Sequence, residues 1–198
     1  MPPTDQAHGL REEVAATAAR LIADAGLDYG AAKRKAIQIV FGSQQAPRNA
    51  MPGNDAIDHA LLEHLKLFDE AHDSRVRRRR EAALELMTLL EAYDLQITGA
   101  VWKGIVTEQA AIHLQAFHDN GKEIMLRLLD LGIAVTPVML PHLRGSGEVE
   151  AMTFWWRDEP VILAAYDARE YRAAPRSPGG QGAERGSRAA LIARMQAG

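Results

Sequence analysis

The chain has 198 residues, of which 47% are hydrophobic; this suffices for a packed domain with a helical extension. The lack of cysteine excludes disulfides, thiolate metal sites and a cysteine nucleophile, and the net charge of −3 disfavours non-specific nucleic-acid binding by the whole surface. Because no apolar run approaches the roughly 20 residues of a membrane span and the first residues lack a secretory-signal pattern, we expect a cytoplasmic protein without a membrane partner.

The first half of the sequence has the apolar spacing of helices. Asp28 is a candidate N-cap, and Gly26 and Gly42 are candidate helix stops. Helices are predicted over residues 11–26, 29–42, 54–71 and 75–93, with a loop over 43–54. The residues expected on buried faces are Ile57, Leu61, Leu62, Leu65 and Phe68 in the third helix and Leu84, Met87, Leu89 and Leu90 in the fourth.

The second half changes to strand patterns. The segment IHLQAF alternates apolar and polar residues, which is typical of a strand with one wet face. Pro137 predicts an edge strand, since proline cannot donate to a ladder. Strands are predicted over residues 95–101, 112–117, 133–140, 149–156 and 160–166, and helices over 120–132 and 188–196. The last two strands should form a hairpin, and the strand–helix–strand unit over 112–139 could add a parallel pair.

This order predicts an α+β fold, with a small mixed sheet flanked by helices. We expect a helical region over residues 1–73, an α+β domain over 74–170 and a basic Pro/Gly-rich tail over 171–198, mobile over 174–187 and with a short helix near its end. From Asp167 onward the chain has six arginines and three acids. This basic end is either a solvated segment or a contact for phosphate, and the sequence leaves both open.

Gly99 and Gly104 frame a G-x-x-x-x-G turn between a short strand and the alternating strand 112–117. The order and spacing resemble the nucleotidyltransferase superfamily of the polymerase-beta type, over about residues 80–166. In that superfamily the turn brings backbone N–H groups close to a triphosphate. Two acids one residue apart on the next strand, with a third on a later strand, hold Mg²⁺. The resemblance implies a similar sheet, with a ligand site beside the turn.

The acids that this resemblance requires are missing from the aligned positions. Ala111 and His113 stand at the first two, and the strand 160–166 has no acid, although Asp167 follows it. Alanine offers no ligand atom, and imidazole suits zinc or iron better than magnesium. Losing these ligands removes most of the charge stabilisation of nucleotidyl transfer. The sequence therefore predicts a retained fold and lost catalysis, with no metal or cofactor; Mg²⁺ is implied only if other acids replace the missing ones.

Several polar side chains near the turn are candidates for a ligand site. His113 is either a phosphate or ribose contact, a general base, or a half-exposed histidine without a role. Lys103 and Thr107 could donate to phosphate oxygens or be ordinary loop residues, and the two glycines serve either the ligand or the turn geometry. The candidate ligand-binding residues are Gly99, Lys103, Gly104, Thr107 and Gln115, and His113 is the candidate catalytic residue.

Two further features stand out in the sequence. Five arginines between Arg75 and Arg80 spread around a helix, and they form either a solvated, salt-bridged face or a phosphate or RNA contact. Trp155 and Trp156 should point to opposite faces of a strand. One is expected in the core, and the other either packs under a helix or stacks on a base.

Three functional hypotheses follow from these patterns. The leading one is a catalytically degenerate nucleotidyltransferase-like protein that binds a nucleotide, a phosphorylated ligand or a partner. The second is an active transferase that uses acids from elsewhere, such as Glu108, Asp119 or Asp167. The third is an interaction module that binds a protein partner or another copy of the chain. Nucleic acid is the least supported ligand.

Overall fold

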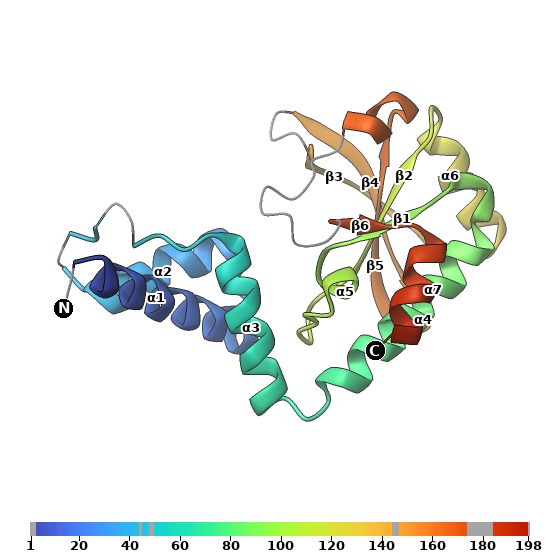
Figure 1. Ribbon diagram of the computed structural model, residues 1–198. Helices are drawn as coiled ribbons and strands as arrows, with labels where there is room; N and C mark the ends of the chain where they lie inside the picture. The colour runs from blue at the N-terminus through green and yellow to red at the C-terminus, as the bar shows by residue number, and fades with distance from the viewer. Residues whose placement is uncertain (1–2, 44, 48–49, 144–146, 174–183, 198) are drawn as a thin grey trace. The chain divides into compact units, whose positions relative to one another are not determined.

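The computed structural model describes residues 3–197 except 44, 48–49, 144–146 and 174–183 (Figure 1). The chain forms two compact units, residues 1–73 with 107–109, and residues 74–106 with 110–198. Over the described residues the fold is α+β with a mixed sheet, as predicted, and it contains seven α-helices and six strands. None of the helices in these residues is both long and apolar enough to cross a membrane.

The first unit is helical, with α1 packed against both α2 and α3. Its helices are α1 (Pro3–Ala25), α2 (Tyr29–Phe41) and α3 (Asn54–Phe68). The predicted cap is confirmed, because the Asp28 carboxylate accepts the Ala31 N–H at 2.9 Å. Tyr29 donates to Asp58 and ties α2 to α3. Burial, together with this bond, raises the pKa of Tyr29.

The predicted buried face of α3 is correct for Ile57, Leu61 and Leu65 but wrong for Phe68. The helix ends at Phe68 rather than at residue 71, so this ring lies at the helix end and is 74% exposed. It contacts His64 one turn back, with ring centroids 4.9 Å apart. The first helix begins at Pro3, eight residues earlier than predicted.

The second unit contains the whole sheet. Its strands are β1 (Gln96–Thr98), β2 (Ile112–Phe117), β3 (Thr136–Pro141), β4 (Glu148–Trp156), β5 (Glu159–Tyr166) and β6 (Arg185–Gly186). Their order is β3-β4-β5-β2-β1-β6; β2 and β5 are parallel, and the other neighbours are antiparallel. The Pro137 strand is at the edge, as predicted.

The parallel pair differs from the expectation for residues 112–139. After α6 (Gly121–Asp130) the chain crosses to β3 at the edge, and the β4–β5 hairpin returns β5 beside β2. Arg157 and Asp158, both with positive φ, form the two-residue turn of this hairpin. The parallel partner of β2 is therefore far away in sequence, where a local pattern does not show it.

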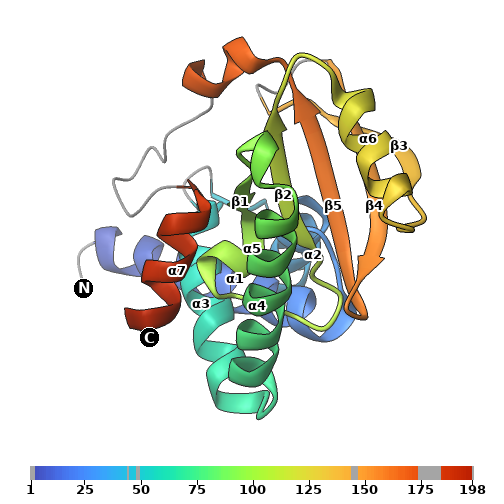
Figure 2. The same cartoon turned by 90° about the vertical axis from the view of Figure 1, so that its right-hand side faces the viewer.

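The helices α4 (His72–Leu89), α6 and α7 (Arg188–Ala197) lie on one side of the sheet (Figures 1 and 2). The main core fills the space between them and includes Ile97, Leu114, Leu163, Leu86, Ile124 and Leu191. Leu89 was predicted to face inward, but it falls just outside the buried arc of α4 and is exposed. The short helices are η1 (Glu91–Tyr93), α5 (Gly99–Lys103) and η2 (Ala168–Ala173).

Part of the predicted tail belongs to the second unit. The strand β6 pairs with β1, and Leu191 of α7 is fully buried in the core. Gly186 lies so close to Trp102 that an added Cβ would overlap the indole ring. Of the stretch predicted to be mobile, residues 174–183 lie outside the described residues, and residues 184–187 lie in or beside β6.

Candidate site on the open face of the sheet

The glycine-framed segment is a short helix rather than a strand and loop. β1 ends at Thr98 rather than at residue 101, and α5 begins at Gly99, which has φ 69°. Gly104 ends α5 with φ 78°, and the N–H groups of Gly104 and Ile105 donate to the Ala100 carbonyl at 2.8 and 2.9 Å. Both glycines thus serve the backbone geometry, which is one of the two interpretations of the sequence.

Arginines of α4 hold the segment after Gly99. The Arg80 Nε donates to the Val101 carbonyl at 3.1 Å, and its Nη2 donates to Trp102 at 3.3 Å. Arg75 is buried, and its Nη1 donates to the Val106 carbonyl at 3.1 Å. Burial, and then the charge of Arg194, lower the pKa of Arg80. These guanidinium groups donate to carbonyls in the last turn of α5 and just after it. A positive charge is favourable at this end of a helix, because the helix dipole is negative there.

Two other arginines of the run bind Glu159 at the start of β5. The Arg79 Nε donates to this carboxylate at 2.7 Å, and Arg78 donates to its other oxygen. The Arg79 and Glu159 side chains are only 5% and 4% exposed. Of the two alternatives for the run, a salt-bridged face fits Arg78 and Arg79, but Arg75 and Arg79 are buried and not solvated. Their acceptors come from segments distant in sequence, so the run alone does not reveal them.

A row of paired residues crosses the sheet on the face opposite α4, α6 and α7. Paired residues on neighbouring strands point to the same side. The row consists of Thr136, Thr153, Ile162, His113, Thr98 and Arg185, from β3 to β6. None of its members is acidic. We call this row the open-face site, because it contains the position where the resemblance to nucleotidyltransferases implies a ligand.

His113 lies at the centre of the open-face site and packs against Gly99. An added Cβ on Gly99 would be 3.6 Å from the His113 Cβ. Burial lowers the pKa of His113, so its imidazole is neutral at pH 7. Over the described residues this imidazole has no hydrogen bond or ion pair. It can therefore donate one hydrogen bond and accept another, but it supplies no cation.

The cation of the open-face site is Arg185, paired with Thr98 on β1. Its guanidinium lies over the rings of Phe117 and Tyr171, 4.7 and 4.6 Å from their centroids. One nitrogen, Nη2, donates to the Tyr171 carbonyl. The other, Nη1, is buried and meets no acceptor in the part of the chain that the structure describes. A buried guanidinium N–H without an acceptor is costly unless a ligand uses it.

The other predicted ligand residues do not all meet here. Gln115 lies in the next row, between Gln96 and Ala164. Lys103 is exposed at the end of α5. Thr107 is buried and belongs to the first unit, as does Glu108. Trp155 points to the face of the open-face site and is 70% exposed, whereas Trp156 packs against the main core.

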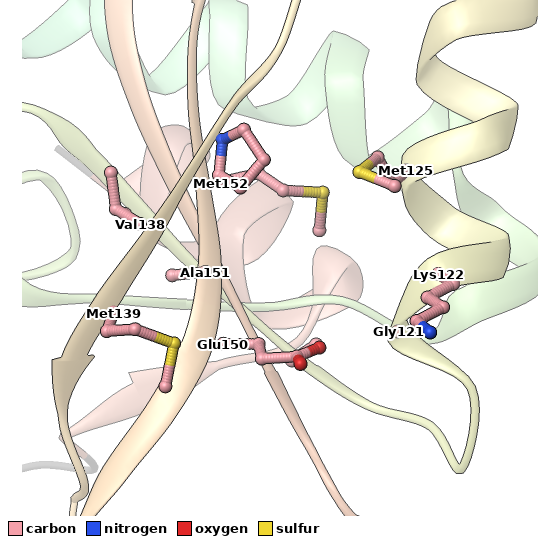
Figure 3. Close-up of a pocket in the computed structure, with 10 residues that line it drawn as sticks. Gly121, Lys122, Met125, Val138, Met139, Glu150, Ala151 and Met152 are labelled. Carbon is pink, nitrogen blue, oxygen red and sulfur yellow. The ribbon is translucent and has the colours of Figure 1, made fainter.

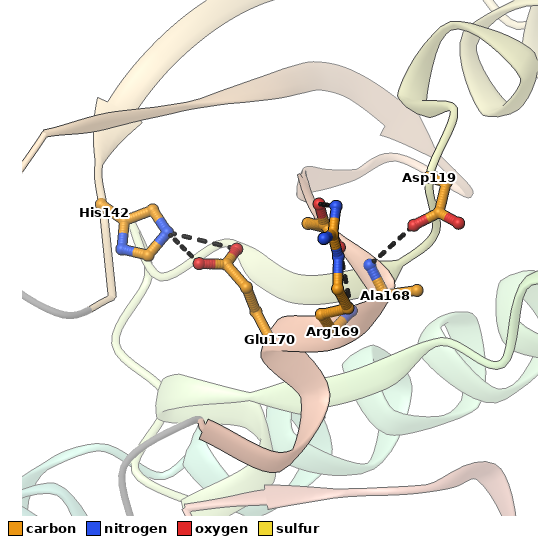
Figure 4. A network of polar contacts seen from close by, with 6 residues as sticks. Asp119, His142, Ala168, Arg169 and Glu170 are labelled. Atoms are coloured by element: carbon orange, nitrogen blue, oxygen red, sulfur yellow. Dashed lines mark hydrogen bonds and ion pairs between the residues drawn. The ribbon is translucent and has the colours of Figure 1, made fainter.

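Two of the three candidate replacement acids, Asp119 and Asp167, follow the carboxyl ends of β2 and β5, whereas Ala111 precedes the start of β2. Figure 4 shows that the Asp119 carboxylate accepts the Ala168 N–H, at 3.2 Å. Asp167 forms an ion pair with Arg169. The backbone N–H of Arg169, and then its guanidinium, lower the pKa of the Asp167 carboxyl. Among the described residues no group of three or more His, Cys, Asp or Glu side chains could hold a metal ion.

The sequence does not identify Arg185 as a ligand residue, although this arginine contributes to the basic charge of the end of the chain. Its signal was the excess of arginine over acid after Asp167. Its place in the sheet depends on the two-residue pairing of β6 with β1, for which the local sequence has no strand pattern. None of the protein-family models, curated proteins or solved structures compared with this chain matches it.

Proposed function

We propose that the second unit is a nucleotidyltransferase-like domain without nucleotidyl-transfer activity, which binds a nucleotide or another phosphorylated ligand on its open face. The observation that carries this proposal is Arg185, whose buried Nη1 lacks an acceptor within the described residues. Arg185 lies two strands from His113, with Thr98 of β1 between them. Guanidinium groups are well suited to phosphate oxygens.

The chemistry of the open-face site supports binding rather than transfer. A two-metal mechanism needs carboxylates gathered at one point. Here Ala111 and His113 occupy the aligned positions, and Asp119 and Asp167 follow the opposite ends of β2 and β5. Glu159 lies at the near end of β5 but is bound by Arg78 and Arg79. Arg185 and the neutral His113 can both donate to a phosphate without a metal ion. The proposed binding is therefore independent of Mg²⁺.

Isothermal titration of the full chain with ATP, CTP, GTP and UTP tests the proposal, in EDTA and again in Mg²⁺. We expect saturable binding of at least one nucleotide in EDTA. Arg185→Gln should weaken it about tenfold, which corresponds to losing one charged hydrogen bond. Arg188→Gln is the matched control, because Arg188 is exposed at the start of α7.

Incubation with α-labelled triphosphates, followed by a search for labelled products, tests the absence of catalysis. Transfer of label in Mg²⁺ that is lost in Asp119→Asn or Asp167→Asn would establish the active-transferase hypothesis instead. No binding of any of the four nucleotides would refute the nucleotide part of the proposal. Equal affinities of the parent and Arg185→Gln would remove the role of the guanidinium.

A further inference from the structure

A cavity lies on the other face of the sheet, between α6 and the strands β3 and β4 (Figure 3). Its volume is about 360 Å³, which is within the range of small-molecule sites. Three methionines line it, Met125 from α6, Met139 from β3 and Met152 from β4. Methionine side chains are flexible and polarisable, and they adapt to apolar ligands of varied shape.

Small residues let the start of α6 pack closely against the sheet beside this cavity. Gly121 at the start of α6 lies so close to β5 that an added Cβ would be 2.9 Å from the Ala165 Cβ. Ala165 pairs with Ala116 on β2, and Glu150 pairs with Met139 on β3. Gly121 and Ala165 both line the cavity together with the three methionines.

Glu150 is an unusual residue for its position. It shares its strand face with Met152 and Phe154, which are buried in the main core. Figure 3 shows its carboxylate turned toward α6, where Lys122 stands at the rim. Both side chains are exposed, and neither forms an ion pair with any residue described in the structure. An apolar cavity is thus flanked by one unpaired anion and one unpaired cation.

We propose that this cavity binds an apolar α-amino acid. The ligand ammonium group would pair with Glu150, its carboxylate with Lys122, and its side chain would lie among Met125, Met139 and Met152. The argument is charge complementarity, because a zwitterion with an apolar side chain satisfies both rim charges and fills the apolar space. The inference is independent of nucleotide binding, since the cavity is on the opposite face from Arg185.

The test is isothermal titration of the full chain with L-leucine, L-methionine and L-phenylalanine. Glycine, the methyl ester and the N-acetyl derivative of the tightest of the three serve as ligand controls. We expect saturable binding of at least one apolar amino acid and at least tenfold weaker binding of each control. Glu150→Gln and Lys122→Met should each weaken binding about tenfold, the value of one charged hydrogen bond.

Glu148→Gln is the matched control for the protein, because Glu148 is exposed on the same strand and the same face. Arg185→Gln should leave amino-acid affinity unchanged, which separates this proposal from nucleotide binding. The tryptophan emission of each variant confirms that the second unit is folded, since all three tryptophans are in it. The proposal is overturned if no amino acid binds saturably, if the ester or N-acetyl derivative binds as well as the parent ligand, or if Glu150→Gln binds normally.

Discussion

The pair formed by Arg79 and Glu159 gives the strongest stability prediction. Replacing Glu159 by alanine leaves the Arg79 guanidinium buried, with its 2.7 Å partner removed. Breaking a buried ion pair from one side costs roughly 3–5 kcal/mol of unfolding free energy. With a urea m-value of about 2 kcal/mol/M, the unfolding midpoint should fall by roughly 1.5–2.5 M.

Urea unfolding followed by tryptophan fluorescence measures this loss in the second unit alone, since Trp102, Trp155 and Trp156 all belong to it. The control is Glu85→Ala, which removes the exposed partner of Arg157 and should leave the midpoint nearly unchanged. Adding Arg79→Met to Glu159→Ala should recover part of the loss, because it removes a buried charge that has lost its Glu159 partner.

The same pair predicts a dependence on pH. Burial alone would raise the pKa of Glu159, but the hydrogen bonds from Arg79 and Arg78 outweigh burial and lower it. A lowered pKa stabilises the folded state above the ordinary glutamate value, and this contribution is lost as the pH falls below about 4.5. Glu159→Gln should lack this part of the loss of stability at low pH.

The argument for the Arg79–Glu159 pair fails if Glu159→Ala shifts the urea midpoint no more than Glu85→Ala does. It also fails if Arg79→Met adds to the loss caused by Glu159→Ala.

Three further predictions concern single positions. Gly186→Ala should lower the unfolding free energy by about 1–3 kcal/mol and change tryptophan emission, because the new methyl overlaps Trp102; an unchanged urea midpoint would contradict this close packing. Gly99→Ala should cost about 1 kcal/mol, since its methyl meets only ordinary contacts and the cost is the left-handed backbone. Gly104→Ala should cost more, because its methyl would be 2.9 Å from the Arg80 Nη2 and would displace the guanidinium from the carbonyls that it binds; equal losses in urea titrations would refute that difference. His113→Gln should remove part of the stability loss of the parent below about pH 6.5, because a lowered histidine pKa favours the neutral folded form; identical pH profiles of the urea midpoint would exclude it.

The elements that the sequence predicts well are those specified by neighbouring residues. The alternation of IHLQAF gives β2 with its buried and half-buried faces, and the short side chain of Asp28 gives the start of α2. The same local logic misplaces the glycine segment. The stretch 95–101 is rich in strand-forming residues, but the chain turns into α5 at Gly99, where arginines of α4 bind the carbonyls that follow.

The parts that the sequence did not predict depend on contacts between distant segments. β6 has only two residues and exists because it pairs with β1, about 88 residues earlier, so it has no periodic signal of its own. The role of Arg79 depends on Glu159, which is 80 residues away. The sequence of the arginine run gives the charges and their positions around the helix, but it does not show that Glu159 is the acceptor for Arg79.

Two glutamates of the β4–β5 hairpin show how far local patterns reach. Glu150 interrupts the apolar sequence of β4, and Glu159 begins β5 directly after the turn residues Arg157 and Asp158. Glu159 meets two arginines of α4 and becomes a structural anion. Glu150 faces a cavity beside Gly121 and Ala165, where the described residues offer no cation that pairs with it. A carboxylate on a core-facing strand position is thus the sequence signal, and only its surroundings decide whether the protein or a ligand supplies the opposite charge.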